Sequence, residues 1–193
     1  MFKITDWFSR ERAHATWLTL PLRRMIIALT VVMLLLPLSR AEACDQPPRR
    51  ALVRITPEQT ILRRGQTRTL AVRVQRVHDL YGVDIIVTFD PQVIEVVDAD
   101  PTKEGVQITQ GEFLDPGFTV YNTADNQRGE IRFTMTQLNP SEAKKGNGVL
   151  FYITIRGKQI GRTRITITKA EMATRDGEYI ENVTRSGKVF VRR

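Results

Sequence analysis

Residues 81–98 read YGVDIIVTFDPQVIEVVD, and this stretch decides the fold. Every second residue from position 83 to 89 is bulky and apolar, the pattern of a strand with one buried face. The residues between them are expected to face outward: Gly82, Asp84, Ile86 and Thr88. Pro91 fixes its own φ, has no amide hydrogen to donate and keeps Asp90 extended. We therefore predict a strand-to-strand corner at Asp90-Pro91, with a second strand starting in QVIEVVD.

The same alternation continues on both sides of this corner. Further runs of this kind are 51–55, 67–74, 117–122, 130–138, 149–157, 163–172 and 188–193. Segments rich in turn residues separate them, such as TADNQRG at 123–129, which reads as a hairpin turn. No helical stripe of useful length follows Leu38. Eight or nine short strands with turns between them predict an all-β chain folded as a β-sandwich.

The first 43 residues have the anatomy of an export signal. Arg23 and Arg24 precede a largely apolar run at 25–38, and Ala41-Glu42-Ala43 follows it. We predict that 1–43 is a signal peptide or a retained signal anchor containing a hydrophobic helix, that 44–50 is a linker and that 51–193 is the folded domain. The protein is then exported, to the extracellular space or the cell surface. Cys44 directly follows the A-x-A end, so lipidation at Cys44 is a second means of membrane attachment.

Charge and cysteine content narrow the classes of function. The chain has 29 basic and 21 acidic residues; six bases and three acids fall in 1–43, which leaves a net charge of +5. These bases are spread along the predicted strands without aromatic neighbours, a pattern that does not indicate nucleic-acid binding. The single cysteine excludes an intrachain disulfide, so the core alone must hold the domain together.

Residues for catalysis or metal binding are sparse. His78 is the only histidine after residue 43, and a zinc site would need further histidines or cysteines. Asp98, Asp100 and Glu104 offer oxygen ligands for calcium, but Pro101 and the lack of a DxDxDG loop favour a solvated loop. We predict no catalytic residue, no cofactor and no metal, and therefore a protein that is not an enzyme.

The order of the pieces resembles a cohesin module. The matching pieces are GQTRTLAVRV, YGVDIIVTFDPQVIEVVDA, RGEIRFTM, GNGVLFYITIRG, GRTRITITKAEM and SGKVFV, spread over about 51–191. Phe89-Asp90-Pro91 followed by Val93, Ile94 and Glu95 is the most specific of them. The resemblance implies a nine-stranded jelly-roll sandwich that binds a dockerin module of a partner protein through one flat sheet face. Cohesins assemble polysaccharide-degrading enzymes in this way.

The resemblance also implies where the partner binds. Cohesins commonly carry an Asn and an Asp two residues apart on the strand before the Asp-Pro corner. Here Asp84 matches the Asp, whereas Gly82 stands in place of the Asn. The predicted partner-binding residues are the outward positions of this strand and of two later runs: Gly82, Asp84, Ile86, Thr88, Arg132, Thr134, Leu150 and Tyr152. We expect Ile86, Leu150 and Tyr152 to form an apolar patch ringed by polar groups.

Two other functions fit the same residues. The sandwich is related to carbohydrate-binding modules, which stack sugars on exposed aromatic rings. Both tryptophans, Trp7 and Trp17, lie in the predicted leader, so a sugar platform would have to use tyrosines such as Tyr121 and Tyr152. The third alternative is a structural or adhesion sandwich of the cell envelope. The partner that the cohesin resemblance predicts is a dockerin-like module, and direct polysaccharide binding is the alternative.

Overall fold

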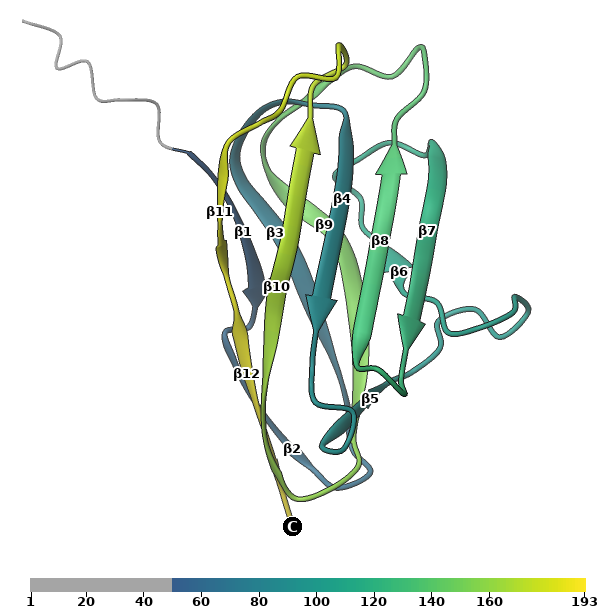
Figure 1. Cartoon of the computed structure of the whole chain (residues 1–193), viewed down its shortest axis with the longest axis vertical. Coiled ribbons are helices and arrows are strands. Elements are labelled where there is room, and N and C mark those ends of the chain that lie inside the picture. Colours follow the sequence, from purple (N-terminus) through teal and green to yellow (C-terminus); the bar gives the residue numbers. More distant parts are fainter. Residues whose placement is uncertain (1–49) are drawn as a thin grey trace, which may run out of the picture. The chain divides into compact units, whose positions relative to one another are not determined.

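The computed structural model describes residues 50–193, and they form two facing β-sheets (Figure 1). The strands are β1 Ala51–Thr56, β2 Gln59–Arg63, β3 Thr67–Leu80, β4 Gly82–Thr88, β5 Ile94–Val96, β6 Thr109–Gln110, β7 Phe118–Asp125, β8 Glu130–Thr136, β9 Lys144–Gly157, β10 Gly161–Ala173, β11 Asn182–Arg185 and β12 Gly187–Arg192. Within residues 50–193 no helix is long and apolar enough to cross a bilayer. The predicted signal segment, the hydrophobic helix in it and Cys44 lie outside the described residues.

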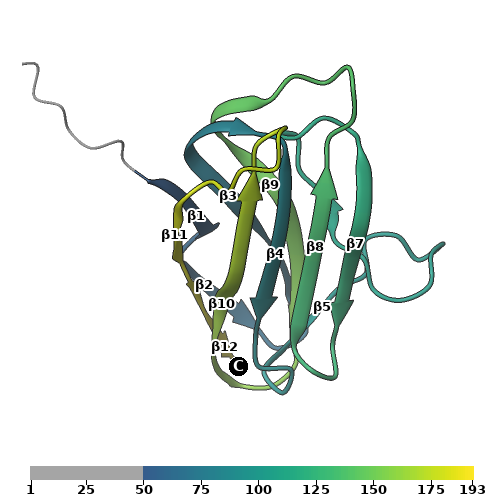
Figure 2. The same cartoon turned by 45° about the horizontal axis from the view of Figure 1, so that its top comes forward.

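Each sheet contains six strands. Sheet one has the order β11-β1-β3-β9-β5, with β6 also paired to β9. Sheet two has the order β2-β12-β10-β4-β8-β7. The view turned by 45° shows β10, β4, β8 and β7 lying side by side as one layer in front of β3 and β9 (Figure 2). The all-β sandwich predicted from the alternation is confirmed.

The number of strands differs from the nine expected, since the described residues contain twelve. The main reason is that the chain changes sheets where one long strand would otherwise run. β1 belongs to sheet one and β2 to sheet two, and β11 and β12 are divided in the same way on either side of Ser186. The very short strands β5 and β6 add to the count because each pairs with β9 over only two or three residues.

β4 has the orientation that its sequence predicts. Val83, Ile85 and Val87 are at most 4% exposed, and the residues between them are partly exposed. β4 lies between β10 and β8, both antiparallel to it, so its backbone hydrogen-bonding groups are used on both edges. The outward residues of β4 therefore lie between residues of β10 on one side and residues of β8 on the other.

Asp90-Pro91 carries the chain from sheet two to sheet one. After β4 the chain turns, with the amides of Val93 and Ile94 donating to the Asp90 carbonyl at 3.2 Å, and continues as β5 in sheet one. Gly129, in the β7–β8 hairpin, packs against this corner with φ +72°, and a Cβ there would lie 2.2 Å from the Phe89 carbonyl oxygen. Only glycine fits this close approach without a shift of backbone. The predicted corner and hairpin are both confirmed.

The core fills the space between the sheets. Phe133 on β8 and Phe151 on β9 are fully buried, and their ring centroids lie 4.8 Å apart. They are surrounded by aliphatic side chains from both sheets, including Ile55, Leu70, Ile85 and Ile153. With no disulfide available, this apolar burial is the main source of stability.

Candidate functional site

The outer side of β10, β4, β8 and β7 gathers the polar residues that the sequence places in alternation with the core. We call it the polar face and define it by outward residues of β4, β8 and β10: Gly82, Asp84, Ile86, Thr88, Arg132, Thr134, Lys169 and Glu171. β4 runs through its middle, with Asp84 opposite Thr134 on one side and opposite Glu171 on the other. Strand pairing thus brings residues far apart in the sequence into neighbouring rows.

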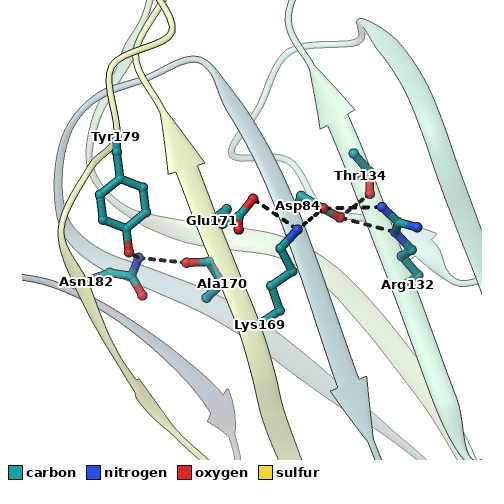
Figure 3. A network of polar contacts seen from close by, with 8 residues as sticks. All are labelled: Asp84, Arg132, Thr134, Lys169, Ala170, Glu171, Tyr179 and Asn182. Atoms are coloured by element: carbon teal, nitrogen blue, oxygen red, sulfur yellow. Dashed lines mark hydrogen bonds and ion pairs between the residues drawn. The ribbon is translucent and has the colours of Figure 1, made fainter.

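Asp84 is the centre of an ion-paired network on this face (Figure 3). Its carboxylate accepts from Lys169 Nζ at 2.7 Å, from the Thr134 hydroxyl, and from Arg132 at 3.4 Å. The Asp84 side chain is only 17% exposed. Burial by itself would raise the pKa of Asp84, but hydrogen bonds from Lys169, Thr134 and Arg132 outweigh it and lower the pKa from 3.8 to about 2.

The two cations that hold Asp84 are themselves held in place. The hydrogen bond to Asp84 raises the pKa of Lys169, and Glu171, whose carboxylate lies 3.0 Å from Lys169 Nζ, raises it further. The Arg132 guanidinium carbon lies 3.9 Å from the centre of the Tyr121 ring. The hydrogen bond from Arg132 to Asp84 raises the pKa of Arg132. The network is therefore charge-balanced, with two acids and two bases.

Lys169 and Glu171 were not predicted from the sequence. Simple alternation from Ile165 and Ile167 would turn Lys169 toward the core. A bulge between Ile167 and Lys169 shifts the register by one residue, so that Lys169 pairs with the outward Ile86 and Met172 is buried. The signal was present in the sequence: Ile167 and Met172 are five residues apart, an odd spacing that one uninterrupted strand cannot place on a single face.

A hollow of about 460 Å³ opens at one end of the polar face. Gly82 and Asp84 of β4 line it, together with Ala173 of β10 and Tyr179 from the loop after β10. Gly82 contributes no side chain to fill the space, and a Cβ added there would lie 3.4 Å from the Thr136 hydroxyl. The hollow therefore lies at the position where the cohesin resemblance expects an Asn and the chain has Gly82.

Exposed apolar side chains border the face along β7. Phe118 is 59% exposed and Tyr121 is 42% exposed, opposite Thr136 and Thr134 of β8. β7 is an edge strand, and large apolar groups are uncommon on an open edge that faces water alone. A flat, ion-paired centre beside an apolar border suits contact with another protein better than it suits chemistry.

Two predicted site residues lie elsewhere. Leu150 and Tyr152 are on β9, in sheet one, so the expected patch with Ile86 does not form. Leu150 is 1% exposed and packs in the core, because a register shift on β9 leaves it as the extra residue between the pairs Phe151–Val72 and Val149–Arg73. Tyr152 is on the outer side of sheet one and donates to Glu112 at 3.0 Å, a hydrogen bond that raises its pKa. The other six predicted residues lie together on the polar face.

The residues considered for chemistry do not converge on a site. His78 is exposed on β3. Asp98 accepts from the backbone amides of Asp100 and Gln107, and Asp100 accepts from Thr102, so these acids order their own loop. In the stretch 50–193 no three histidine, cysteine or acidic side chains are grouped so that they could hold a metal ion.

Asp84 is expected to make the domain less stable in acid. Its pKa is lower in the folded chain than in the unfolded chain, so its stabilising contribution is complete above about pH 4 and is lost as the pH falls toward 2. The loss amounts to about 2 kcal/mol. Asp84→Asn should remove this part of the pH dependence, as measured by urea denaturation between pH 2 and 6. Glu104→Gln is the matched control, and an equal change in that variant would contradict the assignment.

The fold is a β-sandwich that carries, on the outer side of one sheet, an ion-paired network bordered by exposed apolar side chains. The Cohesin domain family matches residues 55–191, so this chain belongs to the cohesin family. No curated protein matches the chain. The resemblance inferred from the order of the sequence pieces is thereby confirmed.

Solved structures show the same fold at low sequence identity. A non-cellulosomal cohesin from Archaeoglobus fulgidus is 16% identical, with 75% of this chain and 92% of that one covered and a TM-score of 0.59. A cohesin in a type I cohesin–dockerin complex from Clostridium thermocellum is 17% identical, with 74% and 99% covered and a TM-score of 0.61. A type II cohesin domain from the cellulosome of Acetivibrio cellulolyticus is 12% identical, with 72% and 95% covered and a TM-score of 0.63.

Proposed function

We propose that this chain is a non-catalytic recognition module that binds a dockerin-type partner through the polar face. The observation that carries the proposal is the convergence of Gly82, Asp84, Ile86, Thr88, Arg132 and Thr134 on one exposed sheet surface. The family supports the kind of partner, because cohesins from Clostridium thermocellum and Acetivibrio cellulolyticus occur in complexes with dockerins.

The contacts that a partner makes here must differ from those made by the Asn and Asp that cohesins commonly carry on the strand before the Asp-Pro corner. Asp84 is already saturated by Lys169, Thr134 and Arg132, so it orients these donors and leaves little acceptor capacity for a partner. The groups left to make contact are the exposed edges of Lys169 and Arg132, the methyl groups of Ile86, and the border at Phe118 and Tyr121. We infer a partner surface that combines acidic and apolar side chains.

A calorimetric titration tests this function. The full-length chain, kept in mild detergent, is titrated with a module from the same genome that carries the paired calcium-loop repeats of dockerins. We expect saturable binding at a molar ratio near one, which is lost when a chelator removes the calcium that the partner's loops need. If none of the genome's dockerin-like modules binds, the module is a structural or adhesion sandwich instead.

Export is part of the proposal. The predicted signal at 1–43 would place the module at the cell surface or outside the cell. There it would bind dockerin-bearing partners, as the cohesins that assemble polysaccharide-degrading enzymes do. Mass spectrometry of the native N-terminus is expected to show cleavage after Ala43. A diacylglyceryl mass increment on Cys44 would identify a lipid anchor, and an intact 1–43 would identify a retained signal anchor.

The sugar-binding alternative has less support from the structure. Tyr121 lies beside Arg132 on sheet two and Tyr152 lies on the outer side of sheet one, so the two rings do not form one platform. Tyr152 is also hydrogen-bonded to Glu112. Tyr152→Ala is accordingly expected to leave migration in gels containing insoluble cellulose unchanged.

A further inference from the structure

Five cations gather on the outer side of sheet two, beyond the polar face. We call this surface the basic face: Arg63 on β2, Lys188 and Arg192 on β12, and Arg162 and Arg164 on β10, around Ile61 and Phe190. In register, Arg162 lies opposite Phe190, which in turn lies opposite Ile61. All five cations are exposed. The sequence spreads these bases over 130 positions, and strand pairing alone brings them together.

The charges of the basic face are not neutralised by ion pairs with other described residues. Among the described residues none of the five makes an ion pair or a side-chain hydrogen bond. Glu58 is the acid that borders the surface, and it is held by Arg54 at 2.6 Å. The basic face therefore presents uncompensated positive charge, unlike the balanced network around Asp84.

Two like-charged pairs face each other directly. Arg164 is the register partner of Lys188, and Arg63 is the register partner of Arg192. Like charges directly opposite on neighbouring strands destabilise a sheet. A sequence that keeps two such conflicts along one strand, β12, with no ion pair to any of the four cations among the described residues, points to a function served by the charge.

One part of the basic face is also hollowed. One hollow of about 360 Å³ is lined by Arg162, Arg164, Lys188 and Phe190, and a second of about 340 Å³ by Glu58, Arg164, Arg185 and Lys188. The two share Arg164 and Lys188, so they adjoin, and most of the charged residues that line them are basic. Two adjoining hollows fit neighbouring units of a chain polymer better than a single small anion.

We propose that the basic face binds an acidic polysaccharide, a polymer with carboxylates on its sugar units. Guanidinium groups bind carboxylates through paired, charge-assisted hydrogen bonds, and four of the five cations are arginines. The half-buried Phe190 ring, with Ile61 beside it, gives the apolar faces of sugar rings a surface to pack on. This binding would hold the module on its polymer while the polar face stays free for a protein partner.

Two other polyanions fit the surface less well. Sites for single-stranded nucleic acid use a series of aromatic rings for stacked bases, and the basic face contains only the ring of Phe190. An anionic membrane would have to meet the end of the domain that carries Arg162 and Arg192. That end, where β10 begins and β12 ends, lies away from the start of β1, the first described strand (Figure 1).

Affinity electrophoresis tests the proposal with polygalacturonate as the acidic polymer and its fully methyl-esterified form as the neutral one. We expect polygalacturonate alone to retard the chain at 0.1 M salt. The double variant Arg164→Gln with Lys188→Gln should bind about tenfold more weakly. The matched control, Arg68→Gln with Lys145→Gln, removes one arginine and one lysine from exposed positions elsewhere and should bind as the unchanged protein does. Neither double variant should melt at a lower temperature by circular dichroism, because the first removes a repulsive pair.

Each other outcome overturns the proposal. Equal weakening in both double variants would show that only net charge matters. Retardation by single-stranded DNA, or binding to phosphatidylglycerol vesicles, without retardation by polygalacturonate would identify a different polyanion. The result is separate from the protein-docking function, because the Arg164–Lys188 variant should still bind a dockerin-type module at full affinity.

Discussion

Phe133→Ala is expected to lower the free energy of unfolding by about 4 kcal/mol. Phe133 is fully buried on β8, and its ring lies 4.8 Å from that of Phe151 on β9, so the pair joins the two sheets at the centre of the core. The substitution removes a large apolar surface from the core, leaves a cavity and breaks an aromatic pair. Guanidinium denaturation followed by circular dichroism measures the loss.

Phe118→Ala is the matched control for this experiment. It removes the same ring from β7, where Phe118 is 59% exposed, and should change the unfolding free energy by no more than about 0.5 kcal/mol. Similar losses in the two variants would mean that Phe133 does not hold the sheets together. Because β8 also carries Arg132 and Thr134 on its other side, Phe133→Ala is further expected to disorder the polar face before the rest of the domain unfolds.

Ile86→Glu is expected to weaken binding of a dockerin-type partner about 100-fold while the domain stays folded. Ile86 is the apolar outward residue of β4, and its register partners are Arg132 and Lys169. A glutamate between these cations finds favourable partners in the free protein, which protects the fold. In the complex it would be an added charge at the centre of the interface, and the cost of removing it from water opposes binding.

Thr154→Glu is the corresponding control. It places the same acid on the outer side of β9, in sheet one, and should leave the dissociation constant measured by calorimetry unchanged. Unchanged binding in Ile86→Glu, or equal losses in both variants, would place the interface outside the polar face. Thermal melts of both variants distinguish lost binding from lost folding.

Most of the candidate site could be predicted because β4 is regular. Its alternation runs unbroken from Gly82 to the Asp-Pro corner, so burial of Val83, Ile85 and Val87 leaves Asp84, Ile86 and Thr88 outward. The same reasoning was wrong for Leu150 and incomplete for Lys169. Both residues lie at register shifts, where one extra residue turns the side chains that follow to the opposite face.

The sequence by itself determined the class of the fold, the Asp-Pro corner and the inward and outward sides of regular strands. These features follow from period-two alternation and from the geometry of proline, which are local properties of the chain. The tertiary structure decided which strands share a sheet, and therefore that β8 and not β9 lies beside β4. It also decided that scattered arginines meet on the basic face, because cross-strand neighbours are set by long-range pairing that no local pattern encodes.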